Sequence, residues 1–223
     1  ILNGDFFVKL SLPFASIFYP TLAYLYLSNL NSGVKMSILL LENYIKELLK
    51  ENKEIIKKIN VFDFDDTIFK SSKVPSNWNN RKKGYWWNSL ESLYQSSYDN
   101  DLKENWIEDT VSEIKNSMTD PESITILCTA RLDRVEIKFQ INSMLREKGL
   151  MFDNIFFKPQ RKKVSSSKYK LDTIKMLLNA YSHADEISFW EDNEENLSVV
   201  KNAIEKNNKS NSRKIKYNSN LVT

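Results

Sequence analysis

The chain has 223 residues, of which 27% are charged and 41% hydrophobic, and its formal net charge is +3. This length suits one domain with an insertion. The low content of Gly and Pro, 4 and 5 residues, argues against a chain that is disordered throughout. The composition does not by itself indicate a nucleic-acid binder. A single cysteine, Cys128, excludes an internal disulfide, and a single histidine, His183, excludes a Cys/His metal cluster. We therefore expect a reducing, intracellular compartment, either cytoplasmic or nuclear.

Residues 1–35 differ from the rest of the chain. Residues 6–30 are rich in Phe, Leu, Tyr and Ala and include one charged side chain. The stretch is long enough to cross a bilayer, but Pro13 and Pro20 interrupt it. We expect this apolar extension to lie outside the folded domain, with a membrane anchor as the alternative. Expression from Met36 tests the expectation.

From residue 36 onward, amphipathic stretches typical of helices alternate with apolar runs typical of strands. The predicted helices are residues 36–56, 133–148, 170–181 and 194–206, and the predicted strands are residues 59–64, 123–129, 154–158 and 186–190. This alternation predicts a doubly wound, Rossmann-like α/β fold with a parallel sheet over residues 36–206. Residues 207–223 form an Asn/Ser/Lys-rich tail that we expect to be loose, except that residues 213–217 could add an edge strand.

Residues 70–121 interrupt this alternation. The stretch is too long for an ordinary connection, contains four of the five Trp residues, and has a predicted helix at residues 102–117. Because it follows the first strand, we expect a small, mostly helical cap above the carboxyl edge of the sheet.

The sequence Asp63-Phe64-Asp65-Asp66-Thr67 ends the first predicted strand with acidic side chains at positions i and i+2. Ligands of open α/β sheets bind at this edge. One carboxylate could attack phosphorus while Mg²⁺ screens the charges, and the other could transfer protons. An acidic turn after a buried strand is the alternative interpretation.

Other sheet-edge segments carry compatible groups. Thr129-Ala130-Arg131 offers a hydroxyl and successive backbone N–H groups for a phosphate, and Glu191-Asp192 offers further oxygen ligands for a hard cation. A lysine could neutralise a phosphoryl oxygen, and the candidates are Lys158, Lys168 and Lys170. Each feature also has a structural explanation as a strand-end cap, a solvated loop or a helix surface, so the argument depends on their combination.

Together these residues resemble the four motifs of the haloacid dehalogenase-like (HAD) superfamily of phosphotransferases. The resemblance implies that Asp63 is the nucleophile and Asp65 the general acid/base, that Thr129 binds the phosphoryl group, and that Lys170 is the third motif. It also implies a Mg²⁺ site, with the candidate ligands Asp63, Asp65, Glu191 and Asp192. Thr67, Ala130 and Arg131 would contact the substrate.

Within that superfamily the chain looks most like the Swiss Army Knife RNA repair-like HAD domains, because Trp86-Trp87 follows the first motif and Trp190-Glu191-Asp192 ends the fourth predicted strand. It departs from that pattern at Ala130, where Gly is usual. It departs again at Asn193 and Asn196, where Arg and His are expected. These differences bear on the substrate more than on the reaction type.

Basic and aromatic residues interleave in the insertion, where bases could stack on the rings of Trp86 and Trp87 while Arg81 follows the phosphates. Packing inside the cap is the other role open to Trp86. Three functions remain open: a Mg²⁺-dependent phosphatase of phosphorylated RNA or other nucleic-acid ends, a phosphatase of nucleotides or small phosphoesters, and a non-catalytic module that binds phosphorylated ends.

Overall fold

The structure, a computed structural model, describes residues 55–79, 81, 84–93, 105–160, 164–210 and 212–223. All of them belong to the compact unit Lys53–Thr223. The strands in this part of the chain are β1 Lys58–Phe62, β2 Ser123–Leu132, β3 Asn154–Lys158, β4 Glu186–Glu191 and β5 Lys216–Leu221. The helices are α4 Glu108–Thr119, α5 Val135–Glu147, α6 Ser166–Ala180 and α7 Glu194–Ser210, with a 3₁₀ turn, η3, at Trp86–Asn88.

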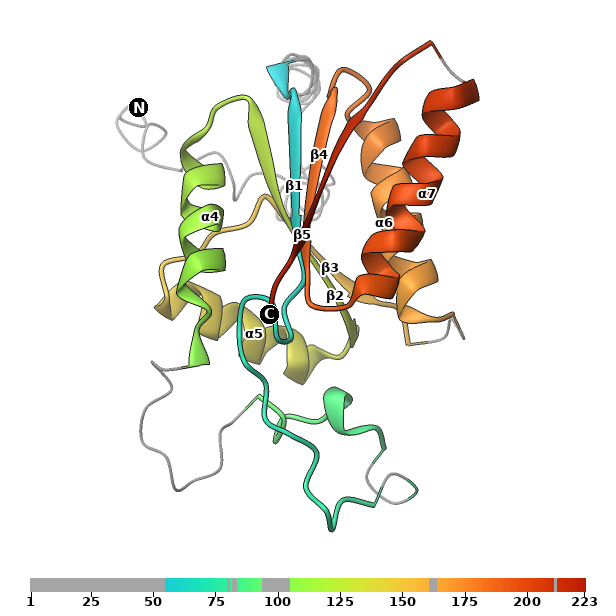
Figure 1. Ribbon diagram of the computed structural model, residues 1–223. Coiled ribbons are helices and arrows are strands. Elements are labelled where there is room, and N and C mark those ends of the chain that lie inside the picture. Colours follow the sequence, from blue (N-terminus) through green and yellow to red (C-terminus); the bar gives the residue numbers. More distant parts are fainter. Residues whose placement is uncertain (1–54, 80, 82–83, 94–104, 161–163, 211) are drawn as a thin grey trace, which may run out of the picture. The chain divides into compact units, whose positions relative to one another are not determined.

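The strands form one parallel sheet in the order β3-β2-β1-β4-β5 (Figure 1). Helices α4 and α5 lie on one face of the sheet, and α6 and α7 lie on the other (Figure 1). The α/β fold with a parallel sheet is therefore confirmed. Parallel strands covered on both faces are expected to be largely apolar, as residues 124–128 of β2 are apart from Thr125.

Successive side chains of the central strands supply two separate cores. Ile59 and Val61 of β1 pack with residues of α6 and α7, whereas Phe62 packs with α4 and α5. The stacked rings of Phe62 and Trp190, with centroids 4.3 Å apart, join β1 to β4 on the second face. These contacts hold the carboxyl ends of the central strands in a fixed register.

The helix expected in the insertion packs against the sheet instead of forming part of a cap. This predicted helix is α4, which begins at Glu108. Its side chains Val111 and Ile114 pack in the core that also contains Phe62 and residues of α5. Helix α4 is the crossover between β1 and β2. We call the described part of residues 70–93 the cap segment; it includes η3, and Arg81 also has helical conformation. Residues 80, 82–83 and 94–104 of the insertion lie outside the described residues, so the mostly helical cap stays a prediction.

The C-terminal tail is less loose than expected, and its possible edge strand at residues 213–217 is present with shifted bounds as β5. Helix α7 continues to Ser210, and β5 pairs in parallel with β4 along its whole length. The backbone makes this pairing, so the polar composition of residues 216–221 does not prevent it.

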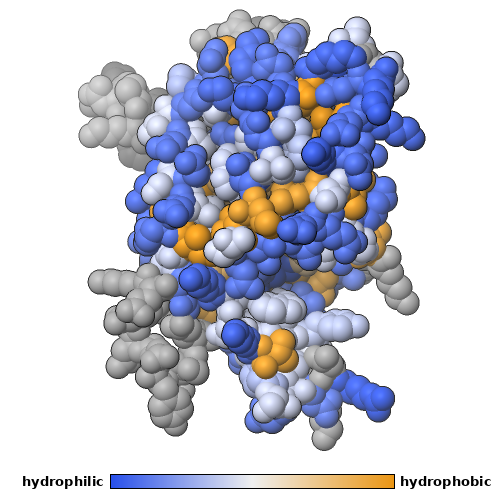
Figure 2. Space-filling model, in the orientation of Figure 1, coloured by the Kyte–Doolittle hydropathy of each residue, from blue (hydrophilic) through white to orange (hydrophobic). Residues whose placement is uncertain are grey.

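Hydrophilic side chains cover most of the face shown in Figure 2, including the outer side of α7. Among the described residues, we find no helix with the length and apolar character that a membrane crossing requires. Residues 1–35 and the predicted helix before residue 55 lie outside the described residues.

Candidate active site

The parallel register brings the acidic residues of two separate strands together. Phe62 pairs with Trp190, so the residues that follow each of them, Asp63 and Glu191, meet at the carboxyl edge of the sheet. The backbone N–H of Asp63 donates to the carbonyl of Trp190 at 3.0 Å, which continues the ladder past β1.

Lys170 lies between these two carboxylates. Its Nζ is 2.9 Å from Oδ2 of Asp63 and 2.5 Å from Oε2 of Glu191, and all three side chains are buried. Ser165 caps α6 by accepting from the backbone N–H of Lys168, so it fixes the helix turn that carries Lys170. Lys168 instead pairs with Asp172.

Burial shifts the protonation equilibria of these groups. Burial raises the pKa of Asp63 to about 6, an effect that the charge of Lys170 opposes. Burial and the neighbouring charge of Asp63 raise the pKa of Glu191 to about 8, again against Lys170. Burial lowers the pKa of Lys170, but its two carboxylate partners outweigh that effect and raise the pKa overall. One ammonium group therefore does not fully compensate two buried carboxylates.

The same carboxylates fit a divalent cation. Carboxylate oxygens of Asp63, Glu191 and Asp192 lie within 4.8 Å of one another. Oδ1 of Asp63 is buried and has no hydrogen-bond partner among the described residues. A set of oxygen donors with one buried, unpartnered atom suits Mg²⁺, which prefers such hard ligands. Asp65 is expected to bind the cation through its backbone carbonyl, which stays a prediction, and its side chain pairs with Arg131.

Two threonine hydroxyls are buried at the same edge. Oγ1 of Thr67 has no partner among the described residues, and Oγ1 of Thr129 accepts from the backbone N–H of Arg131 at 3.2 Å. The tight turn after Asp63 requires a positive φ of 52° at Asp66, a conformation that Asp adopts more readily than most residues. Strand β2 continues through half-buried Ala130, so this segment is extended, and α5 begins shortly after it at Val135.

Asp65 forms an ion pair with Arg131. Nη2 of Arg131 is 2.6 Å from Oδ1 of Asp65, and its Nε is 3.0 Å from Oδ2. The guanidinium is 1% exposed and also donates to the carbonyl of Trp87 and to Oγ of Ser92. Oγ of Ser71 donates to Asp65 as well. The donors of Arg131 therefore face Asp65 and the cap segment.

Three residues of the insertion are expected to contact the substrate, and they differ in burial. Trp86 is buried, donates from Nε1 to the carbonyl of Ser72 at 2.7 Å, and meets the ring of Trp78 edge to face. These contacts fit the packing role. Trp87 is 39% exposed, and Arg81 is also exposed, so both side chains can be reached from solvent. Residues 161–163, whose sequence is Arg-Lys-Lys and which could also contact a nucleic acid, lie outside the described residues.

Sequence reasoning missed the serines that hold Arg131 and Asp65. Ser71 and Ser92 are ordinary loop residues in the sequence, with no motif or periodicity to single them out. The internal pairing of Glu191 with Lys170 was missed as well, since a sequence pattern identifies an acidic residue but not its partner.

We found no match to this chain among curated proteins. A family model, HAD domain family 1 in Swiss Army Knife RNA repair proteins, matches residues 64–223. The match begins one residue after Asp63 and includes Asp65, Thr129, Lys170 and Glu191. Because it covers more than half of the chain, the chain belongs to the HAD domain family of Swiss Army Knife RNA repair proteins.

Proposed function

We propose that this chain is a Mg²⁺-dependent phosphoric monoester hydrolase that acts through an aspartyl-phosphate at Asp63. Membership of a HAD family supports phosphohydrolase chemistry in general. The observation that carries the specific proposal is the buried carboxylate of Asp63, with Oδ2 held 2.9 Å from Lys170 and Oδ1 unpartnered among the described residues.

The residues suggest a two-step reaction. A carboxylate oxygen of Asp63 attacks phosphorus, the bond to the ester oxygen breaks, and Asp65 gives its proton to the departing alcohol. Asp65 then takes a proton from a water molecule that attacks the same phosphorus, which releases inorganic phosphate and restores Asp63. Arg131 fixes the orientation of Asp65 through its ion pair.

The remaining groups balance charge. Lys170 and the hydroxyls of Thr67 and Thr129 would stabilise the phosphoryl oxygens, which is usually the largest electrostatic contribution to catalysis. Mg²⁺ bound by Asp63, Glu191 and Asp192 would offset the negative charge of the entering phosphate.

For the substrate, we propose phosphorylated RNA or other nucleic-acid ends. The family description names RNA repair proteins, and the cap segment presents exposed Tyr85, Trp87 and Arg81 to solvent. Exposed rings beside a cation suit bases and phosphates of a single strand.

A four-substrate panel tests both parts of the proposal. Phosphate release is measured from a 3′-phosphorylated oligonucleotide, a 5′-phosphorylated one, a nucleotide and an aryl phosphate, with Mg²⁺ or with EDTA. We expect Mg²⁺-dependent release that is fastest from an oligonucleotide. Asp63→Asn should lower it at least about a thousandfold, whereas Asp172→Asn on the exposed side of α6 should not.

The other outcomes are equally informative. A preference for the aryl phosphate or the nucleotide would refute the nucleic-acid substrate but keep the hydrolase. No release from any of the four substrates would instead favour a non-catalytic module that binds phosphorylated ends.

A further inference from the structure

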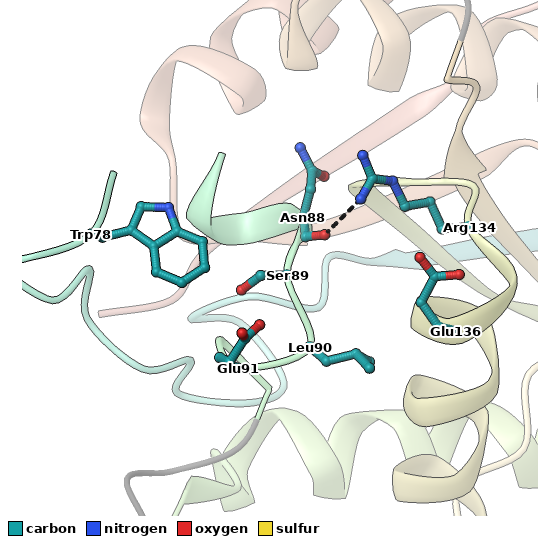
Figure 3. Close-up of a pocket in the computed structure, with 7 residues that line it drawn as sticks. All are labelled: Trp78, Asn88, Ser89, Leu90, Glu91, Arg134 and Glu136. Carbon is teal, nitrogen blue, oxygen red and sulfur yellow. Dashed lines mark hydrogen bonds between the residues drawn. The ribbon is translucent and has the colours of Figure 1, made fainter. Parts of the chain in front are cut away.

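A cavity of about 360 Å³ lies between the cap segment and the start of α5. Figure 3 shows Trp78 and residues 88–91 of the cap segment on one side, and Arg134 and Glu136 on the other. We propose that this cavity is a nucleobase subsite, which rests on the proposed action on nucleic-acid ends. It would take the base of the nucleotide that carries the scissile phosphate.

An unpartnered hydroxyl points to a ligand here. Oγ of Ser89, which lines the cavity, is buried and has no hydrogen-bond partner among the described residues. A buried hydroxyl without a partner costs free energy, and buried polar groups are nearly always paired. A rotation of the Ser89 side chain toward the cavity would allow a bound molecule with a polar edge to supply the missing hydrogen bond.

The lining suits a base better than a phosphate. Two carboxylates, Glu91 and Glu136, and one guanidinium, Arg134, line the cavity, so its net negative charge repels an anion. The two carboxylates can accept hydrogen bonds from an amine. The indole of Trp78 and the side chain of Leu90 add apolar surface, and aromatic rings stack on bases of any sequence. The volume lies within the range of small-molecule sites. The best-fitting ligand is therefore a base with an exocyclic amine, such as adenine.

Hydrogen bonds fix the cavity wall in place. Oδ1 of Asn88 accepts from the backbone N–H of Leu132 at 3.1 Å, and the carbonyl of Asn88 accepts from Arg134 at 3.5 Å (Figure 3). The wall of the cavity thus depends on both the cap segment and the turn that leads into α5, which favours a preformed site.

The same wall is connected to the proposed acid/base. Oγ of Ser92 donates to the carbonyl of Ser89 at 2.8 Å and accepts from Nη1 of Arg131 at 2.7 Å. Arg131 in turn binds Asp65. Two residues, Ser92 and Arg131, therefore link the cavity wall to the proposed proton-transfer group.

Equilibrium binding tests the subsite without requiring turnover. Two labelled oligonucleotides carry a phosphate at both ends and differ only in their terminal nucleotides, which are adenosine in one and abasic in the other. Fluorescence anisotropy measures both affinities in an Asp63→Asn background. We expect the adenosine probe to bind about tenfold more tightly. Ser89→Ala and Glu91→Gln should each reduce that ratio about threefold, and Glu205→Gln on the exposed side of α7 should leave it unchanged.

Equal affinity for the two probes, or a ratio that survives both cavity variants, would overturn the subsite. Competition with adenosine monophosphate identifies the source of the base. If the monophosphate displaces the adenosine probe at a concentration equal to that of the probe, the cavity binds a free nucleotide. If higher concentrations are needed, the cavity binds the end of a strand. The parent chain's release of phosphate from the aryl substrate is measured in parallel. If the proposed function is wrong, the parent chain will release no phosphate from the aryl substrate. If only the subsite is wrong, that release will still be observed.

Discussion

At the scale of single residues, the site carries more negative charge than it neutralises. Lys170 contacts the buried carboxylates of Asp63 and Glu191. The exposed carboxylate of Asp192 lies beside them. Burying carboxylates without compensating charge is costly, so the folded chain favours protonation of Asp63 and Glu191. A divalent cation would remove the same cost in a different way.

This charge imbalance predicts how stability depends on pH and Mg²⁺. The pKa values of Asp63 and Glu191 rise from ordinary values of 3.8 and 4.5 to about 6 and about 8. The folded state then binds more protons than the unfolded state between about pH 4 and pH 8, so these residues reduce stability as pH rises through that window. We expect Mg²⁺ to raise the thermal unfolding midpoint more at pH 8 than at pH 5.5, because at pH 5.5 it must displace protons.

Thermal unfolding at the two pH values, with Mg²⁺ or EDTA, measures this effect. Glu191→Gln serves as the control, since it removes one titrating carboxylate and should shrink the difference between the two pH values. An equal Mg²⁺ effect at both pH values would contradict the assignment of these carboxylates to the cation.

At the scale of elements, Arg131 connects strand β2 to the cap segment. Its guanidinium binds Asp65, the carbonyl of Trp87 and Oγ of Ser92, so one side chain joins three parts of the chain. The planar fork of arginine makes this possible, and a lysine ammonium cannot reproduce it. These hydrogen bonds help to hold the cap segment in position.

Arg131→Lys should therefore loosen the cap segment even though the charge is kept. We expect a loss of about 3 kcal/mol in the free energy of unfolding, because a buried ion pair and its accessory hydrogen bonds are broken. Urea unfolding measures this loss, with the exposed Arg146→Lys on α5 as the matched control. A variant as stable as the parent would show that Arg131 does not hold the cap segment.

Local sequence patterns predicted where the helices and strands lie in the chain better than they predicted how these elements pack. The sequence located β3 at its observed bounds, because a short apolar run between polar turns is an unambiguous signal. It did not show that α4 packs on the sheet, since an amphipathic helix fits a cap or a core equally well. Strand β5 was hard to recognise as a whole because an edge strand can be polar.

At the scale of the whole molecule, the strand order brings the site together. Asp63, Thr129 and Glu191 are separated by many residues but follow or belong to the adjacent strands β1, β2 and β4. The sequence could predict these meeting points, because the carboxyl ends of parallel strands share one edge. It could not predict that Arg131 turns toward Asp65, since that contact depends on serines in the insertion.

The compact unit Lys53–Thr223 contains every described residue of the site. We therefore expect a chain that begins at Met36 to fold cooperatively and to release phosphate from the aryl substrate at close to the full-length rate. Circular dichroism melting and initial rates measure both properties. A truncated chain that aggregates or loses activity would show that residues 1–35 contribute to the folded enzyme.

The most direct test of the central claim is fluorine NMR with beryllium trifluoride, a mimic of the phosphoryl group on an aspartate. It reports on the nucleophile and the cation together and needs no knowledge of the substrate. We predict a bound fluoride signal with Mg²⁺ that disappears with EDTA and in Asp63→Asn but remains in Asp172→Asn. A signal that persists in Asp63→Asn, or none in the parent chain with Mg²⁺, would contradict the proposed phosphoryl site.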